Sequence, residues 1–305
     1  MKILLLGARG QLGRAFFSTL SLNYPHWPVA ALGRDECDIT KAASLKGAMN
    51  RYHPDVIINC AAYTAVDEAQ TKTQLAELIN HEAVVTLARE ARTYGAFLVH
   101  FSTDYVFDGS GTEPWIETDE PRPLNIYGAS KYAGEQVIQA LCPDHLIVRT
   151  SWLYGGEGRH FASTILGRAR EGLPIQVVND QWGAPTRVHW LARMVLFALE
   201  QVSMVPGKRG LYHLSSQGET SWYGFASDLV HAAYGLGLLA KPVPVKPISS
   251  AIGSQVATRP LNSRLDCGLF STTFGIVQPS WQEQMMDWLL RLKAEANPRD
   301  EEHLP

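Results

Sequence analysis

The sequence has few cysteines, no long apolar run and no marked excess of charge of either sign. Its 4 cysteines are scattered over 305 residues without a Cys-x-x-Cys pair, which indicates reduced thiols and argues against a disulfide framework or a cysteine metal site. They are Cys37, Cys60, Cys142 and Cys267. The apolar run Ile3–Leu6 is too short for a signal peptide or a membrane span. The net charge of -3, without a lysine or arginine run, argues against nucleic acid and membrane surfaces as partners. We expect a cytoplasmic protein that binds neither.

Motifs of several enzyme classes are also missing. The chain has no Gly-x-Ser-x-Gly nucleophile elbow and no Gly-Lys-Ser/Thr phosphate loop. Its 10 histidines show no metal-ligand spacing, so we expect them on the surface or in the core. The length fits one large α/β domain or two modest ones.

A glycine-rich turn near the N-terminus is the first pattern that points to a function. Residues Lys2–Leu6 are mostly apolar and typical of a buried parallel strand, and glycines follow at every third position before a helical pattern. Glycines permit a tight strand-to-helix turn and a close approach of backbone to phosphate, and a helix N-terminus offers N–H donors. The turn therefore predicts a dinucleotide site. Its expected cofactor-binding residues are Gly7, Gly10, Gln11, Leu12 and Gly13.

The end of the second expected strand, Val29–Leu32, bears on the choice of cofactor. An acidic residue there usually binds the ribose hydroxyls of NAD, whereas a basic one favours the 2′-phosphate of NADP. This chain has Gly33 and then Arg34, whose guanidinium can meet the phosphate and stack on the adenine. Asp38, followed by Ile39, either lies near the adenine or is a helix-start carboxylate. We expect NADPH to serve at least as well as NADH.

Two further strand ends carry small or hydroxyl-bearing residues. The third expected strand, Asp55–Cys60, is followed by a segment that lets a cofactor lie against backbone at the carboxyl edge of the sheet. That segment is Ala61, Ala62, Tyr63 and Thr64. The fourth strand, Phe97–Phe101, leads to Thr103, which is either a hydroxyl beside the cofactor or a turn-forming side chain. Phe101 itself is expected to contact the cofactor.

Tyr127 and Lys131 lie one turn apart in the expected helix that starts within Asn125–Glu135, and therefore on one face. A free phenol has a pKa of about 10, and a nearby ammonium lowers it. The phenol can then give a proton to a developing alkoxide or take one in the reverse reaction. Alone, the pair fits an ordinary amphipathic helix better. The strand ends upstream favour the acid/base interpretation.

The remaining elements complete an α/β chain with a Rossmann-type doubly wound parallel sheet and a smaller C-terminal substrate-binding cap. We expect a helix from Thr40, as N-cap, to Tyr52, and a long helical pattern that ends at Tyr94 before Gly95. His145–Arg149 is a fifth strand. The later expected strands are Pro174–Val178 and Gly210–Leu214, and the later helices are Val188–Gln201, Ser221–Tyr234 and Trp281–Lys293. We expect residues 1–150 to form the dinucleotide-binding domain and residues 151–296 mainly to bind substrate. Some segments of residues 151–296 should return to the sheet. Residues 297–305 should be disordered.

Together these motifs resemble those of a known family. The glycine turn, Thr103 and the pair Tyr127 and Lys131 occur in the order and spacing of extended short-chain dehydrogenases/reductases. Five segments are similar to the dTDP-4-dehydrorhamnose reductase family, and the last two are specific to that branch. They are Ser102–Gly109 (STDYVFDG), Pro123–Lys131 (PLNIYGASK), Arg149–Tyr154 (RTSWLY), Asn179–Thr186 (NDQWGAPT) and Arg259–Leu265 (RPLNSRL). The likeness runs from the N-terminus to about Leu292.

The resemblance implies reduction of the C4 ketone of dTDP-4-dehydro-L-rhamnose by NADPH or NADH, giving dTDP-L-rhamnose for cell-wall or lipopolysaccharide O-antigen glycans. It implies that Tyr127 protonates the forming alkoxide, that Lys131 lowers the pKa of Tyr127 and binds the nicotinamide ribose, and that Thr103 bonds the reacting oxygen or Tyr127. Substrate contacts are implied for Thr103, Asp104, Trp152 and Arg259. A lone tryptophan is otherwise more often a core residue, and a guanidinium suits a diphosphate.

Two other functions remain open. One is a reductase of another dTDP- or GDP-4-keto-6-deoxysugar. The other is a non-catalytic regulatory subunit that binds NADP and a partner enzyme. The intact set of Thr103, Tyr127 and Lys131 favours an enzyme, because a regulatory subunit does not need all three.

Metal binding and assembly are the last features that the resemblance addresses. Some members of the family bind Mg²⁺ through clustered glutamates at a dimer interface. The matching positions hold Ala15, His189 and Arg291, and none of these is the hard oxygen ligand that Mg²⁺ prefers. We therefore expect no metal and not that dimer, with monomer and homodimer both open.

Overall fold

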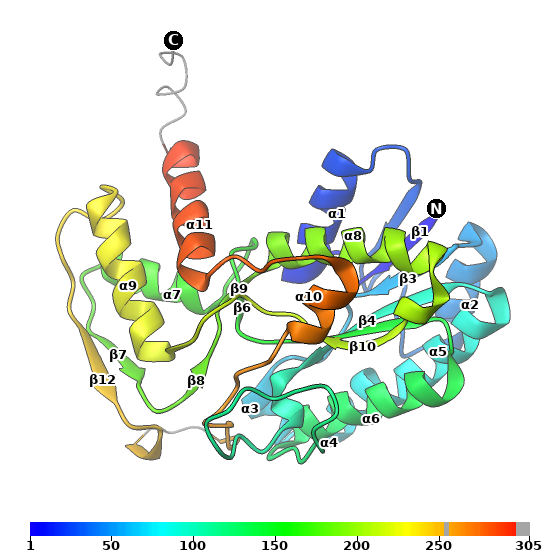
Figure 1. The fold of residues 1–305 in the computed structure, drawn as a ribbon, viewed down its shortest axis with the longest axis horizontal. Helices are drawn as coiled ribbons and strands as arrows, with labels where there is room; N and C mark the ends of the chain where they lie inside the picture. The colour runs from blue at the N-terminus through cyan, green and yellow to red at the C-terminus, as the bar shows by residue number, and fades with distance from the viewer. Residues whose placement is uncertain (253–255, 297–305) are drawn as a thin grey trace, which may run out of the picture.

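A computed structural model describes residues 1–252 and 256–296. Its centre is a sheet of six parallel strands in the order β10-β5-β4-β3-β1-β2 (Figure 1). The strands are β1 (Ile3–Leu6), β2 (Val29–Leu32), β3 (Val56–Asn59), β4 (Phe97–Thr103), β5 (His145–Thr150) and β10 (Gly210–His213). The expected parallel doubly wound sheet is confirmed, and β10 returns to it from beyond residue 150. The tail expected at residues 297–305 lies outside the described residues.

Helices cover both faces of this sheet, as Figure 1 shows. One face carries α1 (Gln11–Asn23), α8 (Val188–Met204) and α10 (Gly268–Phe274), and the other carries α2 (Ala42–Tyr52), α5 (Ala83–Tyr94) and α6 (Ile126–Leu141). Alternate residues of β1 pack into the two apolar clusters on opposite faces of the sheet. Ile3 and Leu5 belong to one cluster, and Leu4 and Leu6 belong to the other. Because β1 is buried on both faces, it must be apolar throughout.

The chain winds outward in both directions from β1. Strand β2 pairs with one side of β1, and β3 pairs with the other side. The connections therefore diverge at the carboxyl ends of β1 and β3, which is where open α/β sheets form a binding crevice. The glycine turn after β1 and the small residues after β3 meet at this point.

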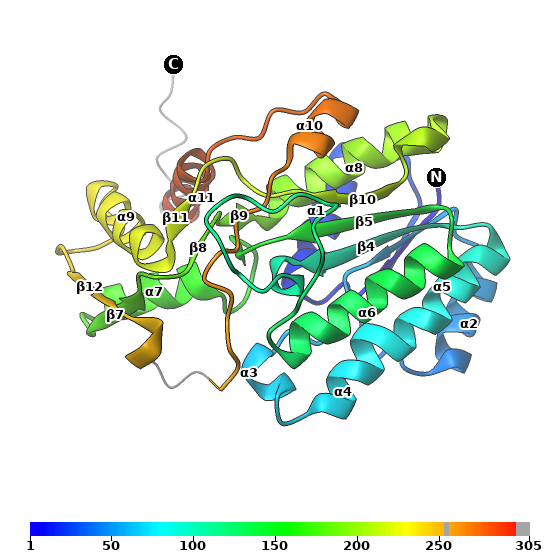
Figure 2. The same ribbon diagram turned by 60° about the horizontal axis from the view of Figure 1, so that its bottom comes forward.

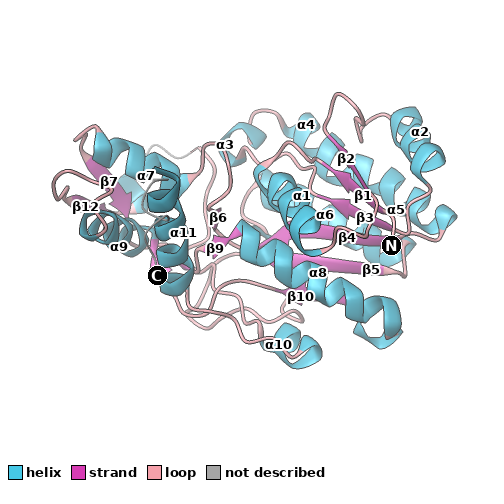
Figure 3. Cartoon of the chain, turned by 90° about the horizontal axis from the view of Figure 1, so that it is seen from above, coloured by secondary structure: helices cyan, strands magenta, loops and turns pink. Residues whose placement is uncertain are grey.

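A second group of elements packs beside the sheet around its own apolar cluster (Figures 2 and 3). Its helices are α7 (Phe161–Arg170), α9 (Trp222–Gly235) and α11 (Trp281–Ala296). Its short strands pair as β7 (Ile175–Val178) with β12 (Val245–Ile248), β8 (Trp182–Gly183) with β11 (Thr220–Ser221), and β6 (Leu153–Tyr154) with β9 (Thr186–Arg187). None of the helices in the described part of the chain is long and apolar enough to cross a membrane.

One local expectation is wrong, and another is confirmed only at its C-terminal end. Thr40 does not cap α2; its hydroxyl donates to Asp38 Oδ1 at 2.7 Å, and Lys41 occupies the N-cap position. The long helical pattern ends at Tyr94 before Gly95 as expected, but it is divided along its length. Its parts are α3 (Val66–Ala69), α4 (Thr73–Glu77), a π-helical turn (Leu78–Glu82) and α5. The π-helical turn has a use, because its Asn80 side chain bonds both backbone groups of Tyr63 and so holds the loop after β3.

A buried ion pair anchors α6 to the sheet. Glu135 of α6 and Arg149 of β5 are 1% and 3% exposed. The Arg149 guanidinium donates to both carboxylate oxygens, with Nε 2.9 Å from Oε1 and Nη2 2.6 Å from Oε2. It also lies over the Phe107 ring, 5.1 Å from its centroid. Since buried charges are tolerated only in such partnerships, the pair fixes the position of the helix that carries Tyr127 and Lys131.

Glu135→Leu leaves the Arg149 guanidinium buried without its carboxylate. We expect the free energy of unfolding, measured by urea denaturation, to fall by about 3–5 kcal/mol. The double variant Glu135→Leu with Arg149→Met should recover much of this loss, because no unpaired charge remains. Glu68→Gln removes an exposed pair with Lys72 and serves as the control that should change little. A loss in Glu135→Leu no larger than in the control would contradict the anchoring role.

Candidate active site

Two adjoining cavities lie at the carboxyl edge of the sheet. The larger, of about 510 Å³, is in the usual range for a small-ligand site. Of the residues expected at the site, it is lined by Gly10, Gln11, Leu12, Ala62, Thr64, Phe101, Thr103, Asp104, Tyr127, Lys131 and Trp152. The smaller, of about 300 Å³, shares Gly10 and Ala62 with it and adds Gly7, Arg34, Asp38, Ile39, Ala61 and Tyr63. Gly13 and Arg259 are the expected residues that line neither.

The glycine turn is shaped by contacts that exclude any side chain. Gly7 has φ +70°, and a Cβ on it would lie 2.6 Å from the backbone nitrogen of Ala61. A Cβ on Gly13 would lie 2.2 Å from the carbonyl oxygen of Gly7. Helix α1 begins directly after Gly10, which makes no side-chain cap. The N–H groups of its first turn are therefore suited to a pyrophosphate.

The smaller cavity holds a basic residue that the sequence interpretation missed. Arg9 of the glycine turn lies over Gly33, so closely that its Nε would be 2.6 Å from a Cβ there. Its guanidinium pairs with Asp35 at 2.8 Å and with Glu36 at 3.4 Å. Gly33 therefore has two effects. It leaves the end of β2 without an acidic side chain, and its lack of a side chain makes room for Arg9 beside Arg34. The signal was present in the sequence as an arginine inside the glycine turn.

Arg34 and Asp38 both line this smaller cavity. Asp38 Oδ1 accepts hydrogen bonds from the Thr40 N–H at 3.1 Å and the Thr40 hydroxyl at 2.7 Å. The hydroxyl bond is the main reason that the pKa of Asp38 lies below its ordinary value. Asp38 therefore organises the turn before α2 and also faces the cavity. Arg34 Nε lies 3.8 Å from Asp38 Oδ2, on a largely exposed side chain.

The start of α6 is held tightly, which fixes the orientation of Tyr127. Asn125 caps the helix, and its side-chain oxygen accepts from the Gly128 N–H at 2.8 Å. A Cβ on Gly128 would lie 2.1 Å from the carbonyl oxygen of Tyr105. The helix therefore packs directly on the short 3-10 helix η2 (Asp104–Val106) that follows β4. In this way the ends of β4 and α6 bring their side chains into one cavity.

Burial dominates the acid/base properties of the pair on α6. It raises the pKa of Tyr127 to about 12, while the Thr103 hydroxyl acts to lower it and Asp104 to raise it. Burial also lowers the pKa of Lys131 to about 8. The structure corrects the expectation that Lys131 lowers the pKa of Tyr127 in the free protein. Lys131 Nζ instead lies 3.2 Å from His100 Nε2.

Asp104 is a buried carboxyl directly after Thr103. Asp104 is only 2% exposed, and the Thr103 hydroxyl donates to Asp104 Oδ1 at 3.2 Å. Burial raises the pKa of Asp104 to about 7, against the opposing effect of the Ser263 hydroxyl. Near neutral pH this carboxyl can therefore donate as well as accept a hydrogen bond.

Unpaired polar atoms in the wall of the larger cavity fit a polar ligand. Gln11 Nε2, Ser102 Oγ and Thr150 Oγ1 are buried without a hydrogen-bond partner in the described ranges. An unpaired buried polar group costs about 1–3 kcal/mol, so such groups call for an explanation. With the glycine turn beside them, they suit a dinucleotide and a polar sugar.

Trp152 lines the larger cavity in a strained conformation, with φ +50°. Its ring stacks on Trp222 of α9 with centroids 3.7 Å apart. A Cβ on Gly183 would lie 2.8 Å from Trp152 Cε2, which explains the glycine in the NDQWGAPT segment. Trp222 also lines the cavity and was not expected there. Because Trp152 follows β5 and Trp222 begins α9, this stacked pair joins the sheet to the cap across the cleft.

Arg259 already has a carboxylate partner. Its Nη1 and Nη2 donate to Asp67 Oδ1 and Oδ2 at 3.0 and 2.8 Å, and the Ala257 N–H donates to the same carboxylate at 3.1 Å. The side-chain bond to Arg259 is the main reason that the pKa of Asp67 lies below its ordinary value. Asp67 was missed in the sequence, where only the arginine was marked by its motif. A diphosphate that binds Arg259 must share or displace this partner.

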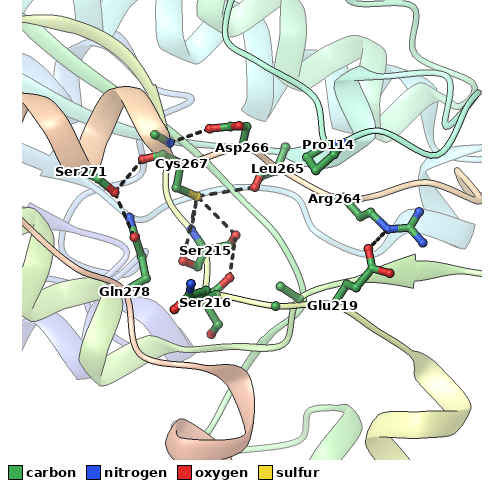
Figure 4. A pocket seen from close by; sticks show the side chains of 14 residues that line it. Pro114, Ser215, Ser216, Glu219, Arg264, Leu265, Asp266, Cys267, Ser271 and Gln278 are labelled. Atoms are coloured by element: carbon green, nitrogen blue, oxygen red, sulfur yellow. Dashed lines mark hydrogen bonds and ion pairs between the residues drawn. The ribbon is translucent and has the colours of Figure 1, made fainter.

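A further polar cavity, of about 420 Å³, lies apart from these residues around Cys267 (Figure 4). Its polar groups are bonded to one another: the Ser215 N–H donates to Cys267 Sγ at 3.2 Å, and the Ser271 hydroxyl donates to Gln278 at 2.9 Å. Burial raises the pKa of the Cys267 thiol to about 11. At neutral pH this thiol is protonated and a poor nucleophile.

The positions matched to the Mg²⁺-binding glutamates lie on α1, α8 and α11. Ala15 is buried against the core. Burial is the main cause of the lowered pKa of His189, and the charges of Arg187 and Arg291 add to it. Two of the matched positions are therefore close together in a region rich in positive charge. The absence of a metal remains a prediction.

Comparisons with known proteins agree with this geometry. A protein-family model described as the RmlD substrate binding domain matches residues 1–294. The dTDP-4-dehydrorhamnose reductase of Salmonella typhimurium is 39% identical over 286 residues, which cover 92% of this chain and 95% of that protein. A probable dTDP-4,6-dihydroxy-2-methyloxan-3-one 4-ketoreductase of Streptomyces antibioticus is 38% identical over 268 residues, covering 87% and 86%.

Solved structures show the same similarity. A dTDP-4-dehydrorhamnose reductase from Clostridium acetobutylicum has a TM-score of 0.88 and 36% identity, with 96% of this chain and 100% of that chain covered. Another from Bacillus anthracis, in complex with NADP, has a TM-score of 0.86 and 35% identity, with 95% and 100% covered.

The raised pKa of Asp104 predicts a pH dependence of stability. The folded protein keeps this proton up to about pH 7, whereas the unfolded chain loses it near pH ~4. Between these values the free energy of unfolding contributed by Asp104 falls as the pH rises, by up to about 1.4 kcal/mol per pH unit. Asp104→Asn removes this titration.

Urea denaturation of the wild type and Asp104→Asn at several pH values from about 4 to about 7 measures the effect. We expect the stability of the variant relative to the wild type to increase as the pH rises through this window. Comparing the two proteins cancels the contributions of the buried histidines. A difference that does not change with pH would contradict the raised pKa.

Proposed function

We propose, from the premise that the chain belongs to the dTDP-4-dehydrorhamnose reductase (RmlD) family, that it reduces the C4 ketone of dTDP-4-dehydro-L-rhamnose to give dTDP-L-rhamnose. The family is one of nucleotide-sugar reductases with the extended short-chain dehydrogenase/reductase fold. The observation that carries the proposal is the presence of Thr103, Tyr127 and Lys131 in the wall of one cavity beside the glycine turn. This arrangement supports an enzyme over a regulatory subunit.

A nicotinamide cofactor held beside the glycine turn would supply the hydride for the ketone carbon. Tyr127 gives its phenolic proton to the forming alkoxide, and Thr103 holds the same oxygen or the phenol by its hydroxyl. The raised pKa of Tyr127 keeps the proton on the phenol until the alkoxide, a stronger base, develops. Thr103, Asp104 and Lys131 in the wall of the cleft are almost completely buried, so hydrogen bonds to the developing charge act in a lower dielectric than in water.

The sugar nucleotide is held by the residues around this centre. Asp104 meets a sugar hydroxyl as donor or acceptor, and Trp152, backed by Trp222, offers an aromatic face. Arg259 suits the diphosphate because a guanidinium can bind two phosphate oxygens at once. Asp67 keeps that guanidinium oriented before the substrate arrives.

NADPH is proposed to serve at least as well as NADH. Arg34 and Arg9 place two guanidinium groups at the end of β2, where a 2′-phosphate is bound in sites of this kind. Asp35 and Glu36 compete for Arg9 and can accept hydrogen bonds from ribose hydroxyls, which keeps NADH usable. The Bacillus anthracis relative in complex with NADP supports this proposal.

The second candidate is a reductase of a different dTDP-linked 4-keto sugar. The Streptomyces antibioticus relative, named as a probable ketoreductase for another such sugar, is almost as similar to this chain as the Salmonella enzyme. The choice between the two rests on the shape of the cleft around the sugar ring. Turnover on both substrates distinguishes them.

The proposal is tested by the loss of NADPH absorbance when purified protein meets dTDP-4-dehydro-L-rhamnose. We expect turnover by the wild type. In Tyr127→Phe, which keeps the ring and removes the proton, the turnover number should fall on the order of 10²–10⁴-fold with cofactor affinity within a few-fold. No turnover by the wild type would contradict the proposed reaction. A tenth or more of the wild-type activity in Tyr127→Phe would contradict the role of Tyr127.

The cofactor proposal is tested by Arg34→Ala. A charge-assisted hydrogen bond is worth about 1.5–3 kcal/mol, so kcat/KM for NADPH should fall about tenfold or more while that for NADH changes little. Lys41→Ala is the matched control, since Lys41 also lies 3.8 Å from Asp38 but outside the cavity lining. Equal loss with both cofactors, or the same loss in Lys41→Ala, would show that Arg34 does not bind the 2′-phosphate.

A further inference from the structure

A chain of buried hydrogen bonds leads from the loop after β3 to Lys131. The Ala61 N–H donates to Asn59 Oδ1 at 3.1 Å, Asn59 Nδ2 lies 3.1 Å from His100 Nδ1, and His100 Nε2 lies 3.2 Å from Lys131 Nζ. Asn59 and His100 are each 1% exposed, and Lys131 is 3% exposed. Three neighbouring elements, β3, β4 and α6, therefore contribute one almost completely buried side chain each, and of the three only Lys131 lines the larger cavity.

The donors and acceptors in this chain can be assigned from one end to the other. A backbone N–H only donates, so the Asn59 atom that faces Ala61 must be the oxygen. The Asn59 NH₂ group then faces His100 Nδ1, which must accept. Burial pushes the pKa of His100 well below its ordinary value, so the ring is neutral. A neutral ring that accepts at Nδ1 carries its proton on Nε2. His100 Nε2 therefore points a donor at Lys131.

An ammonium group has no lone pair to accept this hydrogen bond, whereas a neutral amine has one. The chain is thus fully satisfied only when Lys131 has lost its proton. The carboxylate of Glu135 opposes this only through space, because its two oxygens are bonded to Arg149. Among the described residues, no carboxylate lies within ion-pair distance of Lys131 Nζ.

We propose that His100 is a positioning residue that stabilises the neutral amine of Lys131, so that Lys131 acts as the proton donor that restores Tyr127 in each turnover. The catalytic part of this inference rests on the proposed reductase function. The assignment of the histidine tautomer rests on the structure alone.

The proton balance is simple. Tyr127 loses its proton to the alkoxide and becomes a phenolate. An N–H bond of the Lys131 ammonium breaks and the O–H bond of Tyr127 forms again, so that a positive and a negative charge cancel in a buried site. The neutral amine then accepts from His100 Nε2, and a proton from water restores the ammonium when product leaves. Two opposite charges are removed from a low-dielectric site, which favours the transfer.

The groups that face Lys131 set the direction of its titration. Burial lowers the pKa of Lys131, and Glu135 and the Cys60 thiol act to raise it. Tyr127 and Asp104 face the same cavity, and His100 is neutral. Reduction needs the ammonium, so kcat should be full below the pKa of Lys131 and should decline as the pH rises through it.

The tautomer of His100 can be measured directly in the wild-type protein by ¹⁵N NMR of labelled histidine, with the His100 signals assigned by their loss in His100→Phe. We expect a neutral ring with the proton on Nε2. His145 is an internal control with the opposite tautomer. Its Nδ1 lies 2.6 Å from the Cys142 carbonyl oxygen, so Nδ1 must carry a proton. A His100 ring with its proton on Nδ1, or a charged ring at neutral pH, would overturn the proposal. This measurement does not depend on the substrate and stands whether or not the sugar proposal holds.

Asn59→Asp tests the catalytic part, with turnover measured on whichever keto sugar the protein reduces. A carboxylate accepts from both neighbours, so the proton of His100 moves to Nδ1, Nε2 becomes an acceptor, and the Lys131 ammonium is favoured. The alkaline decline of kcat should shift upward by on the order of one pH unit.

The same substitution in the His100→Phe background separates this relay from the effect of an added charge. The double variant should show no such shift relative to His100→Phe. An equal shift in both backgrounds would mean that the charge of Asp acts through space, and no shift in either would mean that the chain does not control Lys131; each result overturns the proposal.

Discussion

The site depends on one constraint, the burial of ionisable groups where α6 crosses the carboxyl half of the sheet. Lys131 and Glu135 lie one turn apart on α6, and both are almost completely buried. Glu135 is neutralised by Arg149, which fixes the helix, whereas Lys131 faces a neutral histidine. The packing that stabilises α6 therefore leaves the charge of Lys131 poorly compensated. Lys131 lines the same cavity as Tyr127, the proposed acid.

This constraint explains why the pKa values at the site depart from those of the free side chains. Burial moves the pKa of Tyr127 upward, the pKa of Asp104 upward and the pKa of Lys131 downward. All three shifts favour the neutral form of the group. A cleft that favours neutral groups accepts a ketone readily and makes a developing alkoxide a strong base, which is the condition under which a phenol becomes an effective donor.

Much of the fold and the centre of the site were predictable from the sequence because they depend on local patterns. The apolar run of β1, the glycine turn and the strand ends each carry their own signal, and the parallel sheet brings the strand ends to one edge. Arg9, Asp67, Trp222 and His100 were missed for a common reason: each acquires its role from a partner that is distant in the sequence or in another element. The π-helical turn was missed because its benefit, the contact of Asn80 with Tyr63, is tertiary. The pKa of Tyr127 was misjudged because the spacing to Lys131 gives proximity but says nothing about desolvation.

The central claim is that a hydride reaches the C4 carbon of a dTDP-linked keto sugar in this cleft while Tyr127 supplies the proton. The most direct measurement is the NMR spectrum of the product formed from dTDP-4-dehydro-L-rhamnose and NADPH that carries deuterium at the transferable position of its nicotinamide. The account predicts dTDP-L-rhamnose with deuterium bonded to C4 and none elsewhere on the ring. Product with hydrogen at C4, or with deuterium at another carbon, would contradict it.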